Sequence, residues 1–160
     1  MKRNFVCASV IALLLAAAGP LLAQSNTDVG VWKLNVAKSK YVPGPGPRSQ
    51  TRTVVPQGNG WKVTIEGISG TGKTINYNYT TNYDGRDSPL SGMGFPSGAD
   101  TIAIKRVNAD TTTQTDKKDG KVITQGTRVV SKDGKVETIH ARGKDPDGKP
   151  INNLVVYERQ

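Results

Sequence analysis

The sequence is short of cysteine, histidine and aromatic residues, with one Cys, one His and 6% aromatic side chains among its 160 residues. The single Cys7 lies in an N-terminal segment that we expect to be removed, so the mature chain has no thiol. This excludes thiol catalysis, cysteine-based zinc sites and iron–sulfur clusters. The few, dispersed aromatic residues also argue against a stacking surface for nucleic acid, and no cofactor or metal site is expected.

The first 23 residues have the pattern of a secretory signal peptide. Lys2 and Arg3 form a basic start, residues 5–15 are mainly apolar, and Ala23 offers a small residue at the cleavage site. The apolar run is too short for a stable membrane span. We therefore expect an exported protein, periplasmic or extracellular, that consists of residues 24–160 and has no stable membrane insertion.

Charge and composition describe one basic, turn-rich domain. Lys plus Arg is 22 against 13 for Asp plus Glu, a net charge of +9, of which the signal segment carries Lys2 and Arg3. The basic residues are scattered, which favours solubility and weak attraction to anionic envelope polymers over a nucleic-acid site. Hydrophobic residues make up only 35%, and the 18 Gly and 9 Pro predict frequent turns rather than a helical bundle.

Apolar residues alternate with a period of two, and no window shows a convincing helical stripe. The pattern predicts nine strands, at residues 30–36, 50–55, 61–68, 73–84, 101–107, 111–117, 121–130, 135–142 and 151–158. Such a chain is predicted to be all-β: a single antiparallel up-and-down barrel of about 8 to 10 strands, expected to be a monomer.

Three Asp-Gly-Lys turns begin at Asp119, Asp133 and Asp147, each 14 residues after the last. Asp-Gly suits the two positive-φ positions of a type I′ hairpin turn, so the C-terminal third is predicted to be an antiparallel meander. Residues 41–47 alternate Pro and Gly and are predicted to be an irregular connector. Residues 87–98 form a second loop, whose apolar side chains either cap the core or edge a pocket.

Two motifs that suggest chemistry fail the test of their context. Residues 67–74 match the phosphate-binding P-loop letter for letter, but the β-rich segment after them has no helix to supply its N-terminus, so nucleotide binding is rejected. His140 could act as a general base with Glu137 or Glu66, but a lone strand histidine beside Arg142 is more often a solvated residue. No catalytic residue is assigned.

Tyr77, Tyr79 and Tyr83 share one face of the longest predicted strand with Ile75 and Thr81. An aromatic stripe on an amphipathic strand is usually core, but tyrosine hydroxyl groups need hydrogen-bond partners. The stripe is therefore either packed core or the wall of a moderately polar cavity.

Gly30-Val31-Trp32, at the start of the first strand, resembles the G-x-W element of the lipocalin-like superfamily, the calycins. The resemblance implies that Trp32 crosses the barrel floor and that a late basic residue, Arg159 or Arg142, stacks on it. Residues 30–40, 83–87 and 99–102 are also similar to a group of small exported bacterial proteins without assigned function.

Two departures limit what this resemblance implies. Fatty-acid-binding members have a helical lid after the first strand and a late R-x-Y that grips the ligand carboxylate. Here the lid position holds the Pro-Gly run, and Val155 stands where Arg would precede Tyr157. A fatty-acid carboxylate site is not implied, although Tyr157 matches.

We thus expect a barrel that binds a small apolar or amphipathic molecule in its interior. The candidate ligand-binding residues are Tyr77, Tyr79, Tyr157, Arg128, Ile75, Ile102 and Ile104, with Val63 and Ile65 on the same wall and with Trp32 and Arg159 at the barrel floor. The alternative is a packed barrel that acts through its surface as an interaction or inhibitor module for an acidic envelope partner. A hydrolase or isomerase built around His140 is a third class.

Overall fold

The computed structural model describes residues 27–95, 98–145 and 147–160, so the expected signal peptide at 1–23 lies outside the described residues. The described chain folds as an antiparallel β-structure of eleven strands, without an α-helix among these residues. The strands are β1 (Gly30–Leu34), β2 (Ser49–Gln57), β3 (Gly60–Ile68), β4 (Thr74–Thr81), β5 (Asp84–Pro89), β6 (Ser91–Met93), β7 (Thr101–Arg106), β8 (Thr111–Lys118), β9 (Lys121–Val130), β10 (Val136–Lys144) and β11 (Pro150–Arg159).

The all-β class is confirmed, but the expected 8 to 10 strands are too few. Each of the nine predicted strands has a counterpart, and the two extra strands are β5 and β6. Nearly every residue of β5 and all of β6 are exposed, so these strands have no buried face that would produce an alternating pattern. Gly85 in β5 and Gly92 in β6 also have positive φ angles, which are more typical of loops than of strands.

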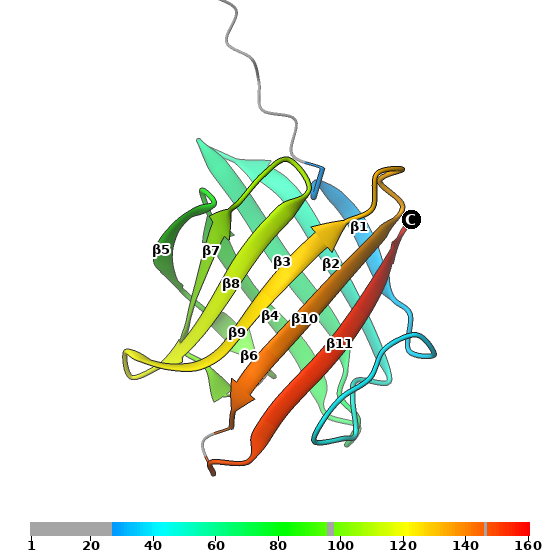
Figure 1. The fold of residues 1–160 in the computed structure, drawn as a ribbon, viewed down its shortest axis with the longest axis vertical. Helices are drawn as coiled ribbons and strands as arrows, with labels where there is room; N and C mark the ends of the chain where they lie inside the picture. The colour runs from blue at the N-terminus through cyan, green and yellow to red at the C-terminus, as the bar shows by residue number, and fades with distance from the viewer. Residues whose placement is uncertain (1–26, 96–97, 146) are drawn as a thin grey trace, which may run out of the picture.

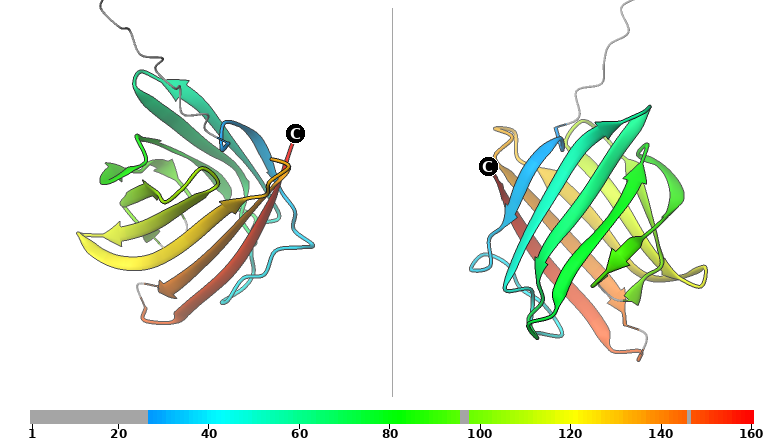
Figure 2. Two further views of the ribbon diagram at one scale, coloured as in Figure 1. Left: turned by 45° about the horizontal axis from the view of Figure 1, so that its top comes forward. Right: turned by 180° about the vertical axis from the view of Figure 1, so that it is seen from behind.

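The strands form one sheet in the order β5-β7-β8-β9-β10-β11-β1-β2-β3-β4-β6. β1 pairs with both β2 and β11, so the first and last strands are neighbours in the sheet (Figure 1). β5 pairs with β7 and β6 pairs with β4, so the up-and-down order is interrupted there. The sheet curls into a nearly closed barrel, whose one seam without a strand pair in the described chain lies between these two short strands (Figure 2).

Inward side chains follow the period-two pattern along the strands. On β4 the predicted stripe is confirmed: Ile75, Tyr77, Tyr79 and Thr81 are buried, and Tyr83 continues it beyond the strand end. One apolar cluster contains Val54, Val63, Ile65, Ile75, Tyr77, Tyr79, Tyr83, Ile102 and Ile104, and a second contains Trp32, Leu34, Val130, Ile139 and Tyr157.

The predicted hairpin turns are present, but not all have the expected type. Asp119 and Gly120 both have positive φ, as a type I′ turn requires. At Asp133-Gly134 only the glycine has positive φ. The Asp133 carboxylate accepts hydrogen bonds from the Lys135 amide at 3.1 Å and the Ser131 hydroxyl at 2.6 Å, which hold it in the other conformation. The type I′ prediction is therefore wrong for this turn.

Candidate functional site

The floor of the barrel is built around Trp32, which is fully buried. The guanidinium of Arg159 lies 4.2 Å from the centroid of the Trp32 ring and donates a hydrogen bond to the Val29 carbonyl at 2.6 Å. Gly30 has a φ of +137°, a backbone conformation that other residues rarely adopt, so a glycine is favoured there. Trp32 and Arg159 thus occupy the floor positions that the resemblance implies, whereas Arg142 is exposed on β10.

Four charged side chains lie buried just above this floor. Arg52 donates to both carboxylate oxygens of Asp28, at 2.5 and 2.6 Å, and to Glu137 Oε2 at 3.0 Å. Arg128 lies 3.6 Å from Asp28 Oδ2 and 3.3 Å from Glu137 Oε1. We call these four residues the floor cluster; its two cations and two carboxylates balance in charge when all are ionised.

The pKa values of the two carboxyl groups in the floor cluster are shifted in opposite directions. Burial raises the pKa of Glu137 to about 7, since the nearby arginines offset only part of the cost of desolvation. Burial alone would also raise the pKa of Asp28, but Arg52 and Arg128 outweigh it and hold that pKa well below 3.8. Tyr83 donates a further hydrogen bond to Asp28 at 2.5 Å.

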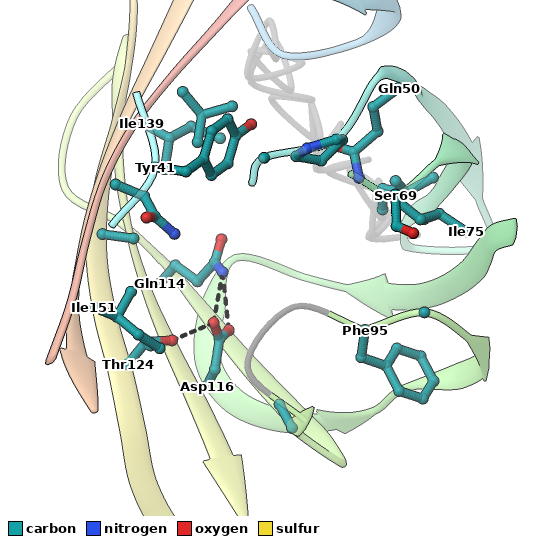
Figure 3. A pocket seen from close by; sticks show the side chains of 18 of the residues that line it. Tyr41, Gln50, Ser69, Ile75, Phe95, Gln114, Asp116, Thr124, Ile139 and Ile151 are labelled. Carbon is teal, nitrogen blue, oxygen red and sulfur yellow. Dashed lines mark hydrogen bonds between the residues drawn. The ribbon is translucent and has the colours of Figure 1, made fainter. Parts of the chain in front are cut away.

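A cavity of about 380 Å³ lies inside the barrel, bounded at one point by Arg52 and Arg128 of the floor cluster. Apolar side chains such as Ile75, Ile139 and Ile151 form much of its wall (Figure 3). Its volume is within the range of small-molecule sites. Tyr77 and Tyr79 of the stripe therefore border a space, whereas Tyr83 packs in the core against Trp61.

Most of the sequence-predicted ligand residues line this cavity. They are Tyr77, Tyr79, Tyr157, Arg128, Ile75, Ile102 and the additional wall residue Ile65. Ile104 and Val63 instead pack in the apolar cluster, away from the lining. Tyr157 donates its hydroxyl hydrogen bond to Gln50 Oε1, and burial raises its pKa well above the ordinary value.

One wall of the cavity is polar, and sequence reasoning missed most of it. Gln114 and Asp116 project from β8 and Thr124 projects from β9 (Figure 3). The segment 111–118 is polar on both faces, so alternation could not show which residues point inward. Arg52 did leave a signal, because it shares the inward face of β2 with Val54.

The Pro-Gly segment 41–47 lies at the edge of the cavity, where Tyr41, Pro43 and Pro45 contribute to the lining. It is fixed to β11 by two hydrogen bonds, from the Val42 amide to Asn153 Oδ1 at 3.0 Å and from the Asn152 amide to the Val42 carbonyl at 2.9 Å. The predicted connector is thus also a strap over one end of the barrel, which we call the mouth strap.

The turn with the P-loop pattern also reaches the mouth, since Ser69 and Gly70 line the cavity. It joins β3 to β4 without a helix, in agreement with the rejection of a phosphate site. In the second loop, Leu90 and Phe95 both pack on the core and line the cavity. The two predicted roles of that loop, capping the core and edging a pocket, therefore both apply.

The residues of the hydrolase hypothesis are not brought together. His140 is exposed on the outer face of β10, whereas Glu137 is fully buried on its inner face, and Glu66 is exposed on β3. Within residues 27–95, 98–145 and 147–160, no group of three or more His, Cys, Asp or Glu side chains could hold a metal ion. In the same ranges, no helix is long and apolar enough to cross a membrane.

No protein-family model matches the chain, and no curated protein matches it significantly. Among solved structures, the chain is similar to zebrafish ileal bile acid-binding protein in complex with cholic acid, at 11% identity over 84% of this chain and 99% of that chain, with a TM-score of 0.49. It is also similar to the siderocalin Ex-FABP, described as functioning through dual ligand specificities, at 11% identity over 84% and 71% of the two chains, with a TM-score of 0.36.

The fold class rests on the chain's own geometry. The strand order, the buried Trp32 under Arg159 and the internal cavity define an antiparallel, nearly closed β-barrel. The similarity to small exported bacterial proteins stays a prediction.

Proposed function

We propose that this chain binds a small, partly apolar molecule inside the barrel. The cavity of about 380 Å³, with apolar walls and a few convergent polar groups, is the observation that carries the proposal. A chain whose interior served only for stability would fill such a space with side chains, because protein cores are close-packed.

In this proposal Ile75 and Ile102 contact the apolar body of the ligand, and Tyr77, Tyr79 and Tyr157 lie around it. Arg128 supplies a polar contact, because it lines the cavity and its Nε and Nη1, although 3.3 Å from Glu137 Oε1 and 3.6 Å from Asp28 Oδ2, make no well-aligned hydrogen bond in the described chain. A buried donor without an acceptor is costly, and a ligand oxygen or a water molecule would satisfy it.

We further propose that the protein acts after export, with residues 1–23 removed as a signal peptide. The pattern of those residues supports this, and an extracytoplasmic carrier with no cysteine is compatible with an oxidising compartment. Binding and export are separate claims, and one preparation tests both.

The experiment is to express the full chain in a bacterial host, isolate the exported fraction and measure its native mass. We expect a protein beginning at Gln24 with a reproducible adduct of a few hundred daltons, of the size that such a cavity holds. Denaturation should release the adduct for identification. A cytoplasmic, unprocessed chain would contradict export without affecting the binding proposal.

A cavity-filling variant provides the specificity control. Ala141 lines the cavity, so Ala141→Phe should abolish the adduct, whereas Ala109→Phe in an exposed turn should keep it. An apo mass for the unaltered protein, with no added ligand bound, would overturn the proposal and favour the packed-barrel interaction module.

A further inference from the structure

The polar wall of the cavity is formed by Gln114, Asp116, Thr124 and Arg128, which belong to three neighbouring inward pairs on β8 and β9. The register places Thr112 opposite Arg128, Gln114 opposite Gly126, and Asp116 opposite Thr124. Arg128 belongs to the floor cluster, and Asp116 lies two pairs further toward the Asp119-Gly120 turn. The wall therefore runs from a cationic to an anionic side chain.

Asp116 is a buried carboxylate without a cation beside it. It is 5% exposed, and it accepts hydrogen bonds from Gln114 Nε2 at 2.8 and 3.1 Å and from the Thr124 hydroxyl at 2.5 Å. None of the ion pairs in the described chain includes Asp116. Arg128 instead donates to Gln114 Oε1 at 3.3 Å, so Gln114 stands between the two charges.

The buried cations of the interior are paired with carboxylates other than Asp116. In the floor cluster, Arg52 and Arg128 are already matched by Asp28 and Glu137. No lysine lines the cavity in the described chain, and the other carboxylate on its lining is Asp145. An anionic ligand would enter a space that already has an excess of carboxylates, whereas a monocation would neutralise Asp116, the more deeply buried of the two lining carboxylates outside the floor cluster.

We propose that the cavity selects molecules with a single ammonium group on an apolar body, and that the ammonium pairs with Asp116. This inference rests on the proposed function and names its ligand class. Asp116 would accept a charge-assisted hydrogen bond, and Gln114 and Thr124 hold the carboxylate in place. The isoleucine side chains elsewhere on the lining would cover the apolar body.

The pKa shift of Asp116 is compatible with this assignment. Burial raises the pKa of Asp116, against the hydrogen bonds from Thr124 and Gln114 and the field of Arg128. An ammonium at contact distance would reverse that shift. Binding is best measured at pH 8, above the pKa of about 7 of Glu137, so that the floor cluster carries its full complement of charge.

The test compares octylamine, octanol and octanoate by isothermal titration calorimetry at pH 8 on the purified exported chain. The three probes share one apolar body and differ in head-group charge. We expect octylamine to bind at least about tenfold more tightly than the other two, the size of effect that one charge-assisted hydrogen bond produces. Tighter binding of octanoate, or equal binding of octanol and octylamine, would overturn the inference and leave the proposed function standing.

Asp116→Asn is the matching variant, because it removes the charge and keeps an acceptor. It should weaken octylamine binding about tenfold and change octanol binding by less than about twofold. The control is Asp119→Asn, the same change at an exposed position of the same hairpin, which should leave all three affinities unaltered. Unchanged octylamine affinity in a folded Asp116→Asn protein would contradict the pairing.

Two results separate this inference from the proposed function. If Asp116→Asn does not fold, the ranking of the three probes on the unaltered protein still decides the inference. If none of the three binds and the native mass is that of the apo protein, the proposed function fails, and the inference fails with it.

Discussion

The buried arginine Arg52 of the floor cluster joins separate parts of the molecule. From β2 it reaches Asp28, which precedes β1, and Glu137 on β10, so one guanidinium bridges three parts of the barrel. Both acceptors are almost completely buried. Stability should therefore depend on keeping this charge in place.

Arg52→Met should lower the free energy of unfolding by roughly 3–5 kcal/mol, because it removes the cation that pairs with both Asp28 and Glu137 while these carboxylates stay buried. Urea unfolding followed by circular dichroism measures the change. The exposed Arg86, which lies 3.6 Å from Asp84, is the control, and Arg86→Met should cost no more than about 1 kcal/mol. Equal losses in both variants would contradict the role of the floor cluster.

A second prediction concerns the pH dependence of stability. The folded protein keeps the proton of Glu137 up to a pKa of about 7, whereas the unfolded chain releases it near 4.5. Between these values the folded state binds more protons, so the free energy of unfolding should fall as the pH rises from about 5 through 7. Unfolding midpoints at a series of pH values measure this, and in Glu137→Gln the decline should become clearly smaller, with the remainder due to the raised pKa of Asp116. An undiminished decline in that variant would assign it to groups other than Glu137.

The positions of some buried side chains could be predicted from the sequence, and those of others could not. Trp32, Tyr77 and Tyr79 could be placed because strand parity and a known sequence element fix the direction of their side chains. Asp116 could not, since its strand is polar on both faces. The pairing of Arg52 with Asp28 and Glu137 depends on strand neighbours far apart in sequence, which a local pattern does not reveal.

Among the elements, the mouth strap and the β3–β4 turn touch closely. A Cβ at Gly70 would lie 2.5 Å from the Gly46 carbonyl oxygen and 2.7 Å from Pro45 Cγ. Arg48 Nε also donates to the Gly70 carbonyl at 3.2 Å. The absence of a side chain at residue 70 is thus what allows the two segments to close over this end of the barrel.

Gly70→Ala should push the mouth strap away from the turn and speed the exit of a bound probe severalfold, with a stability loss below about 1 kcal/mol because the site is peripheral. Stopped-flow release of the fluorescent probe N-phenyl-1-naphthylamine measures the rate. Thr71→Ala changes the neighbouring exposed residue without reaching the strap, and its release rate should equal that of the unaltered protein. No acceleration in Gly70→Ala would mean that the probe leaves by another route.

The strands themselves were predictable where one face is buried. The nine segments with alternating burial were found from the sequence, with ends shifted by a few residues at most. β5 and β6 were not found, because a strand exposed on nearly all its residues has the composition of a loop.

At the scale of the whole molecule, the seam between β5 and β6 is the weakest part of the barrel wall. Both strands are paired on one side only in the described chain, and both are largely exposed. In contrast, β2, β3, β10 and β11 have partners on both sides. Local opening should therefore begin at the seam.

Hydrogen–deuterium exchange should show this difference. Peptides that cover residues 84–93 should exchange their amide hydrogens fastest, and those from β2, β3, β10 and β11 slowest, because their ladder hydrogen bonds are protected by neighbours on both sides. Ligand binding should slow exchange at Leu90, which lines the cavity. Uniform exchange around the barrel would contradict a weak seam.

The placement of the aromatic rings has a spectroscopic consequence. Both tryptophans lie away from the cavity lining of the described chain: Trp32 is under Arg159, and Trp61 packs edge-on against Tyr83 with ring centroids 5.1 Å apart. Four of the five tyrosines are on that lining: Tyr41, Tyr77, Tyr79 and Tyr157. Intrinsic tryptophan emission should therefore be almost insensitive to an occupant of the barrel. A ligand screen that relied on tryptophan quenching would pass over true binders, and ultraviolet difference absorbance of the tyrosine rings would detect them.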